Sequence, residues 1–288
     1  MIRVFPHRTK WTPTDNMVFV GYPPLPLFRP DDPDIPVHIS VTFTWDKARG
    51  EELAGCWNQL YNNVQIGGPA YDDPGEEFIP GRYLKDGVTI TSRGCPHGCS
   101  FCYVHKREGA VRELEIKPGH ILQDNNLLAC SRQHIEAVFN MIRANGVAAN
   151  FNGGLDARLL QPWHRNLFDN IKLSELWFAC DTPGSLKHLE SAAKIVEGIS
   201  INKLRCYVMV GYGDETIEEA TSRLESVYEL GFLPFCQLYR GDEPVRWSQE
   251  WRHLARCWSR PAIYKSIMKK KETPIPRQRG LWDILGEQ

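Results

Sequence analysis

The sequence lacks long apolar runs. No hydrophobic stretch approaches the roughly 18 to 20 residues that a helix needs to cross a bilayer, and the N-terminal segment MIRVFPHRTKWTPTD does not resemble a signal peptide. Repeats, low-complexity tracts and Gly/Ser linkers are also missing, which argues against solenoids and flexibly tethered modules. We therefore expect a compact protein that stays in the cytoplasm and has no membrane partner.

There is also little net charge. The 288 residues carry 34 Lys/Arg and 35 Asp/Glu, and the formal net charge is -1. With 42% hydrophobic and 24% charged residues, the composition is ordinary for a globular protein and disfavours disordered, collagenous and coiled-coil classes. The neutrality conceals an asymmetry, because residues 240–280 carry eleven Lys/Arg against four Asp/Glu. A basic C-terminal segment follows an acidic body.

Cysteine, in contrast, is plentiful. The chain has nine cysteines, an odd number that argues against complete internal disulfide pairing. In a reducing compartment, closely spaced thiols more often hold a metal or take part in chemistry than form structural disulfides. The cysteine spacing is therefore the first place to look for function.

The chain divides into three parts. Residues 1–36 are rich in proline and predict an extended arm with few regular elements. Residues 37–44 indicate a buried strand, 46–61 a helix and 63–68 a second strand, which together predict a parallel βαβ unit. We assign residues 1–86 to this arm and βαβ extension, 87–240 to a core, and 241–288 to a basic helical segment.

Strand and helix patterns alternate regularly through the core. Helices are predicted from Ser131, over 162–171, over about 185–199, and from a capping box formed by Thr216 and Glu219. Six βα units predict an α/β fold with a parallel sheet, which we interpret as a partial (β/α)6 barrel. A doubly wound open sheet is the alternative, and both architectures bind ligands at the carboxyl ends of their strands. The predicted strands are 88–92, 120–124, 148–152, 175–181, 204–210 and 233–240.

Three cysteines follow the first of these strands. Cys95, Cys99 and Cys102 have C-x3-C-x2-C spacing. Three thiolates on one short loop can hold three irons of a cubane [4Fe–4S] cluster and leave the fourth iron open to a ligand. Two other interpretations stay open, namely inert thiols and a structural zinc site with His97 or His105 as fourth ligand.

The segment TSRGCPHGCSFC resembles the signature of the radical S-adenosylmethionine (SAM) superfamily, C-x3-C-x-aromatic-C, and looks most like its methylthiotransferase and cobalamin-associated branch. The resemblance covers about residues 87–240. It implies that Cys95, Cys99 and Cys102 ligate a [4Fe–4S] cluster whose open iron chelates SAM. One electron, from an external flavodoxin- or ferredoxin-like donor, then yields a 5′-deoxyadenosyl radical that abstracts hydrogen. Phe101 and Tyr103 are expected near the cofactor.

The resemblance also assigns roles at the other strand ends. Asp124, with Gln123 and Asn125, occupies the position of a segment that binds the SAM amino group, although a helix-entry cap is an alternative for Asp124. Asp181 is expected to contact the ribose or methionine part of SAM, unless it only forms a turn. The fifth-strand stretch that would support adenine contains Val208, Met209 and Gly211.

Polar residues after the third strand are candidates for the substrate pocket: Asn150, Asn152, Asp156 and Arg158. For Arg158, a structural salt bridge is an equally good explanation. Cys180, Cys206 and Cys236 lie on successive strands without close pairing, so they are interpreted as buried apolar residues rather than ligands of an auxiliary cluster.

The substrate is the least determined feature. Trp247, Trp251, Tyr264 and neighbouring basic residues combine phosphate attraction with stacking surfaces, which favours a nucleic-acid or nucleotide substrate. The helical spacing of Trp247, Trp251, Leu254 and Trp258 equally indicates a core-facing stripe.

The whole chain looks like compact phage radical SAM proteins, which implies isomerisation of an amino-acid-bearing thymine in DNA hypermodification. The alternatives are modification of a peptide, an RNA or a small metabolite, and a non-catalytic iron–sulfur protein. The N-terminal βαβ unit resembles a remnant of a cobalamin-binding domain, but it lacks the D-x-H-x-x-G loop of that domain.

Overall fold

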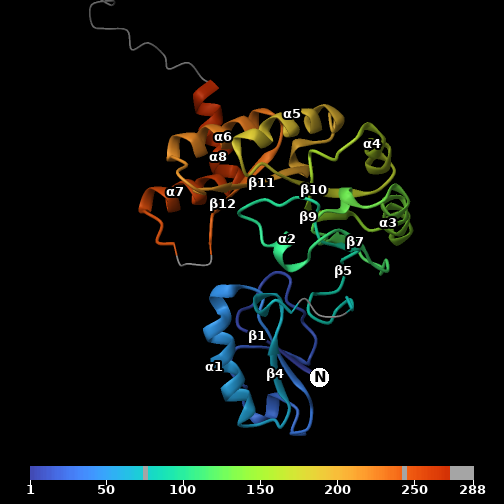
Figure 1. Ribbon diagram of the computed structural model, residues 1–288, viewed down its shortest axis with the longest axis vertical. Helices are drawn as coiled ribbons and strands as arrows, with labels where there is room; N and C mark the ends of the chain where they lie inside the picture. Colours follow the sequence, from blue (N-terminus) through green and yellow to red (C-terminus); the bar gives the residue numbers. More distant parts are fainter. Residues whose placement is uncertain (74–76, 242–244, 273–288) are drawn as a thin grey trace, which may run out of the picture.

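A computed structural model describes residues 1–73, 77–241 and 245–272, with side chains to residue 269. The chain forms a smaller N-terminal part, at the bottom of Figure 1, and a larger part above it. Each has its own hydrophobic core, built from residues between 2 and 71 in the smaller part and between 122 and 268 in the larger part. No helix of the described residues is long and apolar enough to cross a membrane.

The smaller part is a parallel sheet with the strand order β2-β1-β3-β4. Strands β3 (Val37–Ser40) and β4 (Val64–Gly67) are joined by helix α1 (Lys47–Asn58), so the predicted βαβ unit is confirmed. The sheet also contains β1 (Ile2–Phe5) and β2 (Val18–Val20).

Strands β1 and β2 correct the expectation that residues 1–36 form an arm with few regular elements. Ile2 and Val4 are fully buried, and β1 lies in the middle of the sheet. The reason is that a four-residue strand needs only two inward-facing apolar residues when neighbours cover both of its edges. The prolines that suggested an arm lie between β2 and β3, where Pro26 begins a short 3-10 helix and Pro33 lies in a turn.

The larger part is built on a six-stranded parallel sheet with the order β12-β11-β10-β9-β8-β5. Each strand therefore pairs with its predecessor in this sheet, without the reversal that defines a doubly wound sheet. The predicted α/β class and parallel sheet are confirmed. The strands are β5 (Val88–Thr89), β8 (Ile121–Leu122), β9 (Ala149–Leu155), β10 (Leu173–Ala179), β11 (Leu204–Val210) and β12 (Leu233–Leu238).

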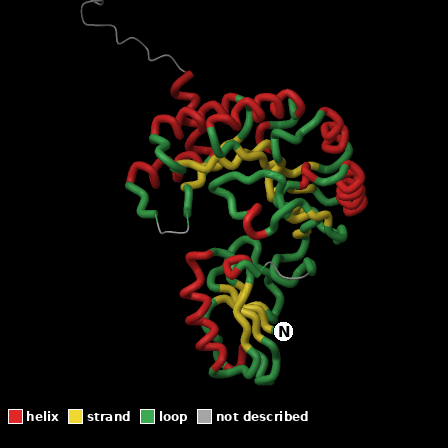
Figure 2. Tube along the Cα trace, viewed as in Figure 1, coloured by secondary structure: helices red, strands yellow, loops and turns green. Residues whose placement is uncertain are grey.

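Helices cover one side of this sheet, and the other side faces the smaller part (Figure 2). The Ser131 hydroxyl accepts the His134 N–H, and Thr216 and Glu219 form a reciprocal capping box, so both predicted helix starts are confirmed. The helices that follow the strands are α3 (Arg132–Asn145), α4 (Pro162–Asp169), α5 (Leu186–Ile195) and α6 (Ile217–Glu229).

The C-terminal segment adds α7 (Gln249–Trp258) and α8 (Pro261–Glu272). Trp258 and Tyr264 are buried and stack on each other with ring centroids 5.4 Å apart. Leu254 is also buried and Trp251 packs against the core, so the core-facing interpretation of the stripe holds for Trp251, Leu254 and Trp258. Trp247 is only half-buried and packs on Gly211 instead. The arginines beside the stripe are exposed: Arg246, Arg252, Arg256 and Arg260. The side chains of Lys270 and Lys271, and residues 273–288, lie outside the described residues.

Candidate functional site

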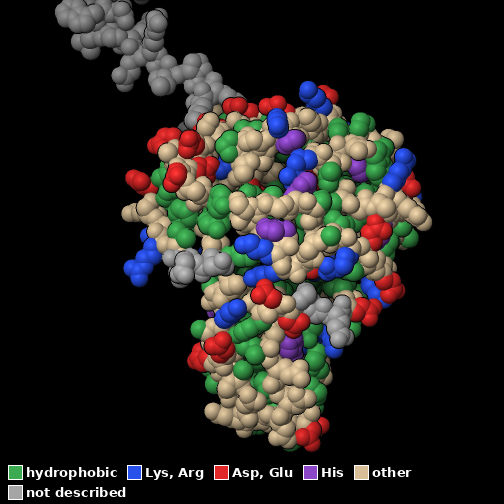
Figure 3. Space-filling model, viewed as in Figure 1, with side chains coloured by type: hydrophobic (Ala, Val, Ile, Leu, Met, Phe, Trp, Pro, Cys, Tyr) green, Lys and Arg blue, Asp and Glu red, His purple; other side chains and the backbone are tan. Residues whose placement is uncertain are grey.

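One large cavity, of about 2050 Å³, lies where the two parts meet. Its lining comes from the carboxyl ends of strands in both sheets, including Thr42 after β3 and Gly68 after β4 in the smaller part. The larger part contributes residues that follow β6, β8, β9, β10 and β12. Basic and acidic side chains both gather at this junction on the surface (Figure 3). The cavity has the position that ligands take in parallel α/β folds.

All three cysteines of the C-x3-C-x2-C loop line this cavity. The loop runs between β6 (Ser92–Arg93), which pairs with β7 (Arg112–Glu113), and the short helix α2 (Val104–Arg107). Its first turn needs glycine, because Gly94 has φ +86° and a Cβ there would lie 2.1 Å from the Ala110 carbonyl oxygen. Burial raises the pKa of the Cys102 thiol above its ordinary value.

Asp124 fixes the start of the loop. Its Oδ1 accepts the Thr91 N–H at 2.8 Å, both hydroxyls of Thr91 and Ser92 at 2.9 Å, and the Ser92 N–H. These bonds turn the chain away from β5, so the strand predicted over 88–92 is split between β5 and β6. Burial raises the pKa of Asp124 despite these hydrogen bonds. The alternative of a helix-entry cap finds no support, since its described bonds run to the cysteine loop.

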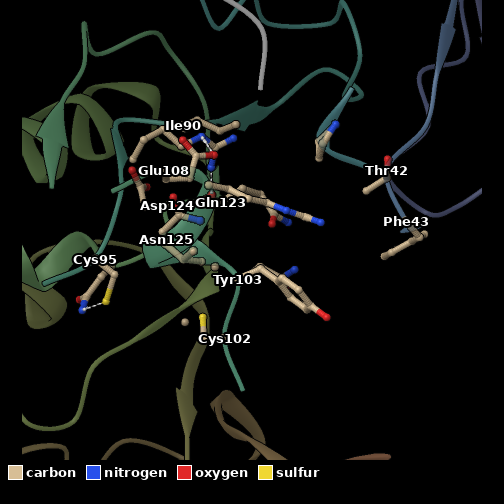
Figure 4. A pocket seen from close by; sticks show the side chains of 18 of the residues that line it. Thr42, Phe43, Ile90, Cys95, Cys102, Tyr103, Glu108, Gln123, Asp124 and Asn125 are labelled. Atoms are coloured by element: carbon tan, nitrogen blue, oxygen red, sulfur yellow. Dashed lines mark hydrogen bonds and ion pairs between the residues drawn. The ribbon is translucent and has the colours of Figure 1, made fainter. Parts of the chain in front are cut away.

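Asn125 and Gln123 hold the same loop. The Asn125 Oδ1 accepts the Gly94 N–H at 3.0 Å, and the Gln123 carbonyl oxygen accepts from the Arg93 guanidinium at 3.2 Å. Figure 4 shows the side chains of Gln123, Asp124 and Asn125 together on one wall of the cavity, beside Cys102 and Tyr103. The segment after β8 therefore positions the cysteines as well as lining the cavity.

Asn126, which ends the same polar segment but was given no role of its own, links the cysteines to the next strand end. Its Nδ2 lies 3.4 Å from the Cys95 Sγ and 3.0 Å from the Asp156 Oδ2. The same carboxylate oxygen lies 2.7 Å from the His97 Nε2. Its place directly after the predicted site residues 123–125 was the available signal, but contact with Cys95 depends on the tertiary fold.

Asp156 and Arg158 form the salt bridge that was considered for Arg158. Two guanidinium nitrogens lie 2.7 and 3.0 Å from the carboxylate. Burial alone would raise the pKa of Asp156, but the hydrogen bonds and charge of Arg158 outweigh it and lower the pKa. Arg158 also interacts with the Cys99 thiol. Its contacts with Asp156, and to a lesser extent with Cys99, raise the pKa of Arg158. The pair places a cation beside the cysteine loop.

Several buried polar atoms beside this loop have no hydrogen-bond partner among the described residues. They include the Asp124 Oδ2, the Gln123 Nε2, the Asn126 Oδ1 and the Asn152 Oδ1, and all four side chains line the cavity. Such atoms are costly unless something binds them. This donor and acceptor set fits a polar cofactor, and the three thiols fit a cluster with one open iron. In the described residues, however, no three His, Cys, Asp or Glu side chains are gathered closely enough to hold a single metal ion.

The fourth and fifth strand ends also reach the cavity. Asp181 lies after β10, and its Oδ1 accepts the Met209 N–H of β11 at 2.9 Å. Burial raises the pKa of Asp181. Met209 lines the cavity, whereas Val208 points into the helix-covered core. Gly211, with φ +78°, packs so closely on Trp247 that a Cβ would lie 2.3 Å from its ring.

Asn150 needs a correction, because it does not belong to the described lining of the cavity. The predicted strand ended at residue 152, but β9 continues to Leu155 and Asn150 lies near its start. Its Nδ2 contacts the Glu175 carboxylate at 3.3 Å. The strand continues through Gly153, which allows it to approach the Asp124 backbone. A Cβ at residue 153 would lie 2.1 Å from the Asp124 carbonyl oxygen.

The aromatic residues of the loop reach β11. Phe101 contacts Tyr212 edge-on with ring centroids 5.4 Å apart, and the Tyr212 hydroxyl lies 2.8 Å from the Ser100 Oγ. Phe101 and Tyr103 both line the cavity. Sequence analysis did not select Tyr212 as a site residue, because only the fold brings residues 100 and 212 together.

Cys180, Cys206 and Cys236 are buried in the core, as predicted. Burial raises the pKa of Cys180 and of Cys236 to about 12. These thiols are therefore protonated at neutral pH and behave as small apolar side chains.

No protein-family model matches this chain, and no curated protein matches it.

Proposed function

We propose that the protein is a radical SAM enzyme with a [4Fe–4S] cluster on Cys95, Cys99 and Cys102. The observation that carries the proposal is that all three cysteines line one cavity together with buried, unpaired polar atoms from the two neighbouring strand ends. When bound, the cluster and SAM supply one-electron cleavage of a carbon–sulfur bond and hydrogen abstraction from an unreactive carbon. An external flavodoxin- or ferredoxin-like protein would supply the electron.

The residues of the chain have distinct parts in this proposal. Asn126, through its Nδ2, and Arg158, as a cation, stabilise the thiolate forms of Cys95 and Cys99. Asp124 holds the loop with one oxygen and offers the other to the ammonium group of SAM. Asp181 and Met209 lie where the rest of SAM would extend. The parallel sheet is then an open partial barrel, closed by the smaller part at its cavity end.

For the substrate, we propose an amino-acid-bearing thymine base, isomerised in the course of DNA hypermodification. In a thymine that bears glycine, the reaction would abstract hydrogen from the glycyl carbon, move the amino-acid fragment and return the hydrogen. A cavity shared by two parts would suit such a reaction. The reaction needs room for a nucleotide beside SAM, and about 2050 Å³ provides it.

Anaerobic reconstitution with iron, sulfide and reductant tests the proposal. We expect about four irons per chain and formation of 5′-deoxyadenosine when SAM and dithionite are added. Cys99→Ala is expected to abolish both. Cys56→Ala is the matched control, because Cys56 is half-buried on α1 outside the cavity lining.

Two results would overturn the assignment: full cluster loading without 5′-deoxyadenosine, or cleavage that survives in Cys99→Ala. Stoichiometric zinc without iron in the anaerobically purified protein would instead favour the structural zinc site. Incubation with modified DNA, followed by nucleoside analysis, tests the substrate separately.

A further inference from the structure

The cavity wall opposite the cysteine loop carries two exposed aromatic rings. Phe43 and Trp45, in the connection from β3 to α1, stack with an interplanar angle of 8° and centroids 4.6 Å apart. They are 40% and 53% exposed. Figure 4 shows Phe43 and Thr42 across the cavity from Cys102, Tyr103 and Gln123. A flat aromatic surface left open inside a cavity is typical of a site for a planar ring.

An arginine completes this surface. Arg240, which follows β12 in the larger part, places its guanidinium carbon 4.8 Å from the centroid of the Trp45 ring. No carboxylate of the described residues forms an ion pair with Arg240. Arg240 is exposed, so its guanidinium can take an anion beside the stacked rings. A planar ring with an attached anionic group is the chemistry of a nucleotide.

The loop that carries the rings is held in place before any ligand arrives. The Asp46 N–H donates to the Phe43 carbonyl oxygen at 3.0 Å, and the Ala70 N–H donates to the Val41 carbonyl oxygen at 3.0 Å. Gly68 makes the second bond possible, because it has φ +103° and a Cβ there would lie 2.9 Å from that oxygen. A surface ordered in advance loses little conformational entropy on binding.

We propose that Phe43, Trp45 and Arg240 form the nucleotide subsite of this protein, with the base stacked on the aromatic pair and the phosphate on Arg240. The subsite gives the smaller part a role in substrate recognition beyond packing. That this nucleotide is the substrate of the reaction rests on the proposed function. Nucleotide binding at Phe43, Trp45 and Arg240 is independent of the proposed function, because neither the cluster nor SAM contributes to it.

Equilibrium dialysis of the purified full chain with thymidine 5′-monophosphate, and separately with single-stranded oligothymidylate, tests the subsite. Stacking is worth about 1–3 kcal/mol per base, so Trp45→Ala and Phe43→Ala are each expected to weaken binding by about fivefold or more. Phe28→Ala is the control, because Phe28 is an exposed ring outside the cavity lining and its loss is expected to change nothing. Arg240→Gln is expected to weaken binding of the monophosphate. Thymidine is dialysed in the same way as the probe without phosphate, and its binding is expected to stay unchanged in this variant.

Unchanged binding in Trp45→Ala and Phe43→Ala would overturn the subsite, as would failure of the wild-type chain to bind either probe. Binding of the oligonucleotide alone would assign the subsite to a base within a strand. Formation of 5′-deoxyadenosine by the wild-type chain without nucleotide is measured in parallel. Trp45-dependent binding without any 5′-deoxyadenosine in the wild type would therefore reject the proposed function and keep the subsite, and the reverse pattern would reject only the subsite.

Discussion

The two walls of the cavity are built on different physical principles. The wall formed by the cysteine loop is polar and locked, with Asp124 holding two backbone N–H groups and two hydroxyls at once. The opposite wall is aromatic and open, with Phe43 and Trp45 facing the cavity. The two walls therefore suit different tasks. A reactive group needs charges that are fixed in position, whereas a planar ligand needs only a flat surface.

Asp124→Ala is the strongest way to break the locked wall. The substitution leaves the Thr91 and Ser92 N–H groups without their acceptor inside the protein, and buried unpaired donors cost about 1–3 kcal/mol each. For the two donors together we expect about 2–6 kcal/mol lower free energy of unfolding in urea, and loss of iron binding after reconstitution. An unchanged unfolding midpoint with normal iron content would show that the loop holds its shape without Asp124.

Gly211→Ala tests how far the locked wall depends on the C-terminal segment. The added methyl group would collide with the Trp247 ring at a backbone φ of +78°. We expect a loss of about 1–3 kcal/mol in thermal or urea unfolding. Gly213→Ala, with φ +66° and nothing within 4 Å of the new Cβ, is the control for backbone strain alone. Equal losses in both variants would mean that the Trp247 contact contributes nothing.

The charge of Asp124 gives a smaller, pH-dependent effect. Burial raises its pKa in the folded protein, so the folded state binds the proton more tightly than the unfolded state. Ionisation therefore costs stability as the pH rises from the ordinary carboxyl pKa of about 4. Asp124→Asn keeps an acceptor oxygen and cannot ionise. We expect its unfolding free energy, relative to wild type, to increase between pH 4 and 7, and a decrease would contradict the burial argument.

The smallest expected effect lies on the open wall. Trp45→Ala removes an exposed ring, and surface substitutions usually change stability by no more than about 0.5 kcal/mol. We expect an unchanged melting temperature beside the weakened nucleotide binding described above. A large drop in melting temperature would mean that the Trp45 ring stabilises the contact between the two parts.

The sequence contained most of the larger sheet. Its strands and helix caps, such as Ser131 and Thr216, are local patterns that survive in the fold. The errors arose where tertiary contacts decided the outcome. Strand β9 continues through Gly153, where its backbone approaches Asp124, and β1 forms from four residues because neighbouring strands cover it.

The site was predictable to the same degree. The spacing of Cys95, Cys99 and Cys102 identified the loop, and the strand-end rule found Asp124 and Asp181. Contacts across the sheet, such as that of Asn126 with Cys95, could not be predicted from the sequence because they depend on how neighbouring strand ends align. The aromatic pair was also missed, since nothing local shows that the smaller sheet directs its carboxyl ends at the larger one.

The strand order of the larger sheet has a consequence for how the protein is made. Because β8, β9, β10, β11 and β12 each pair with the preceding strand of the sheet, every pairing closes only a short stretch of chain. Short closures cost little entropy and favour fast folding. Each βα unit can be added to the growing sheet soon after it leaves the ribosome. The hydrogen bonds from Asp124 and Asn125 to Thr91, Ser92 and Gly94 join residues within the first half of the chain, so none of them depends on its last third.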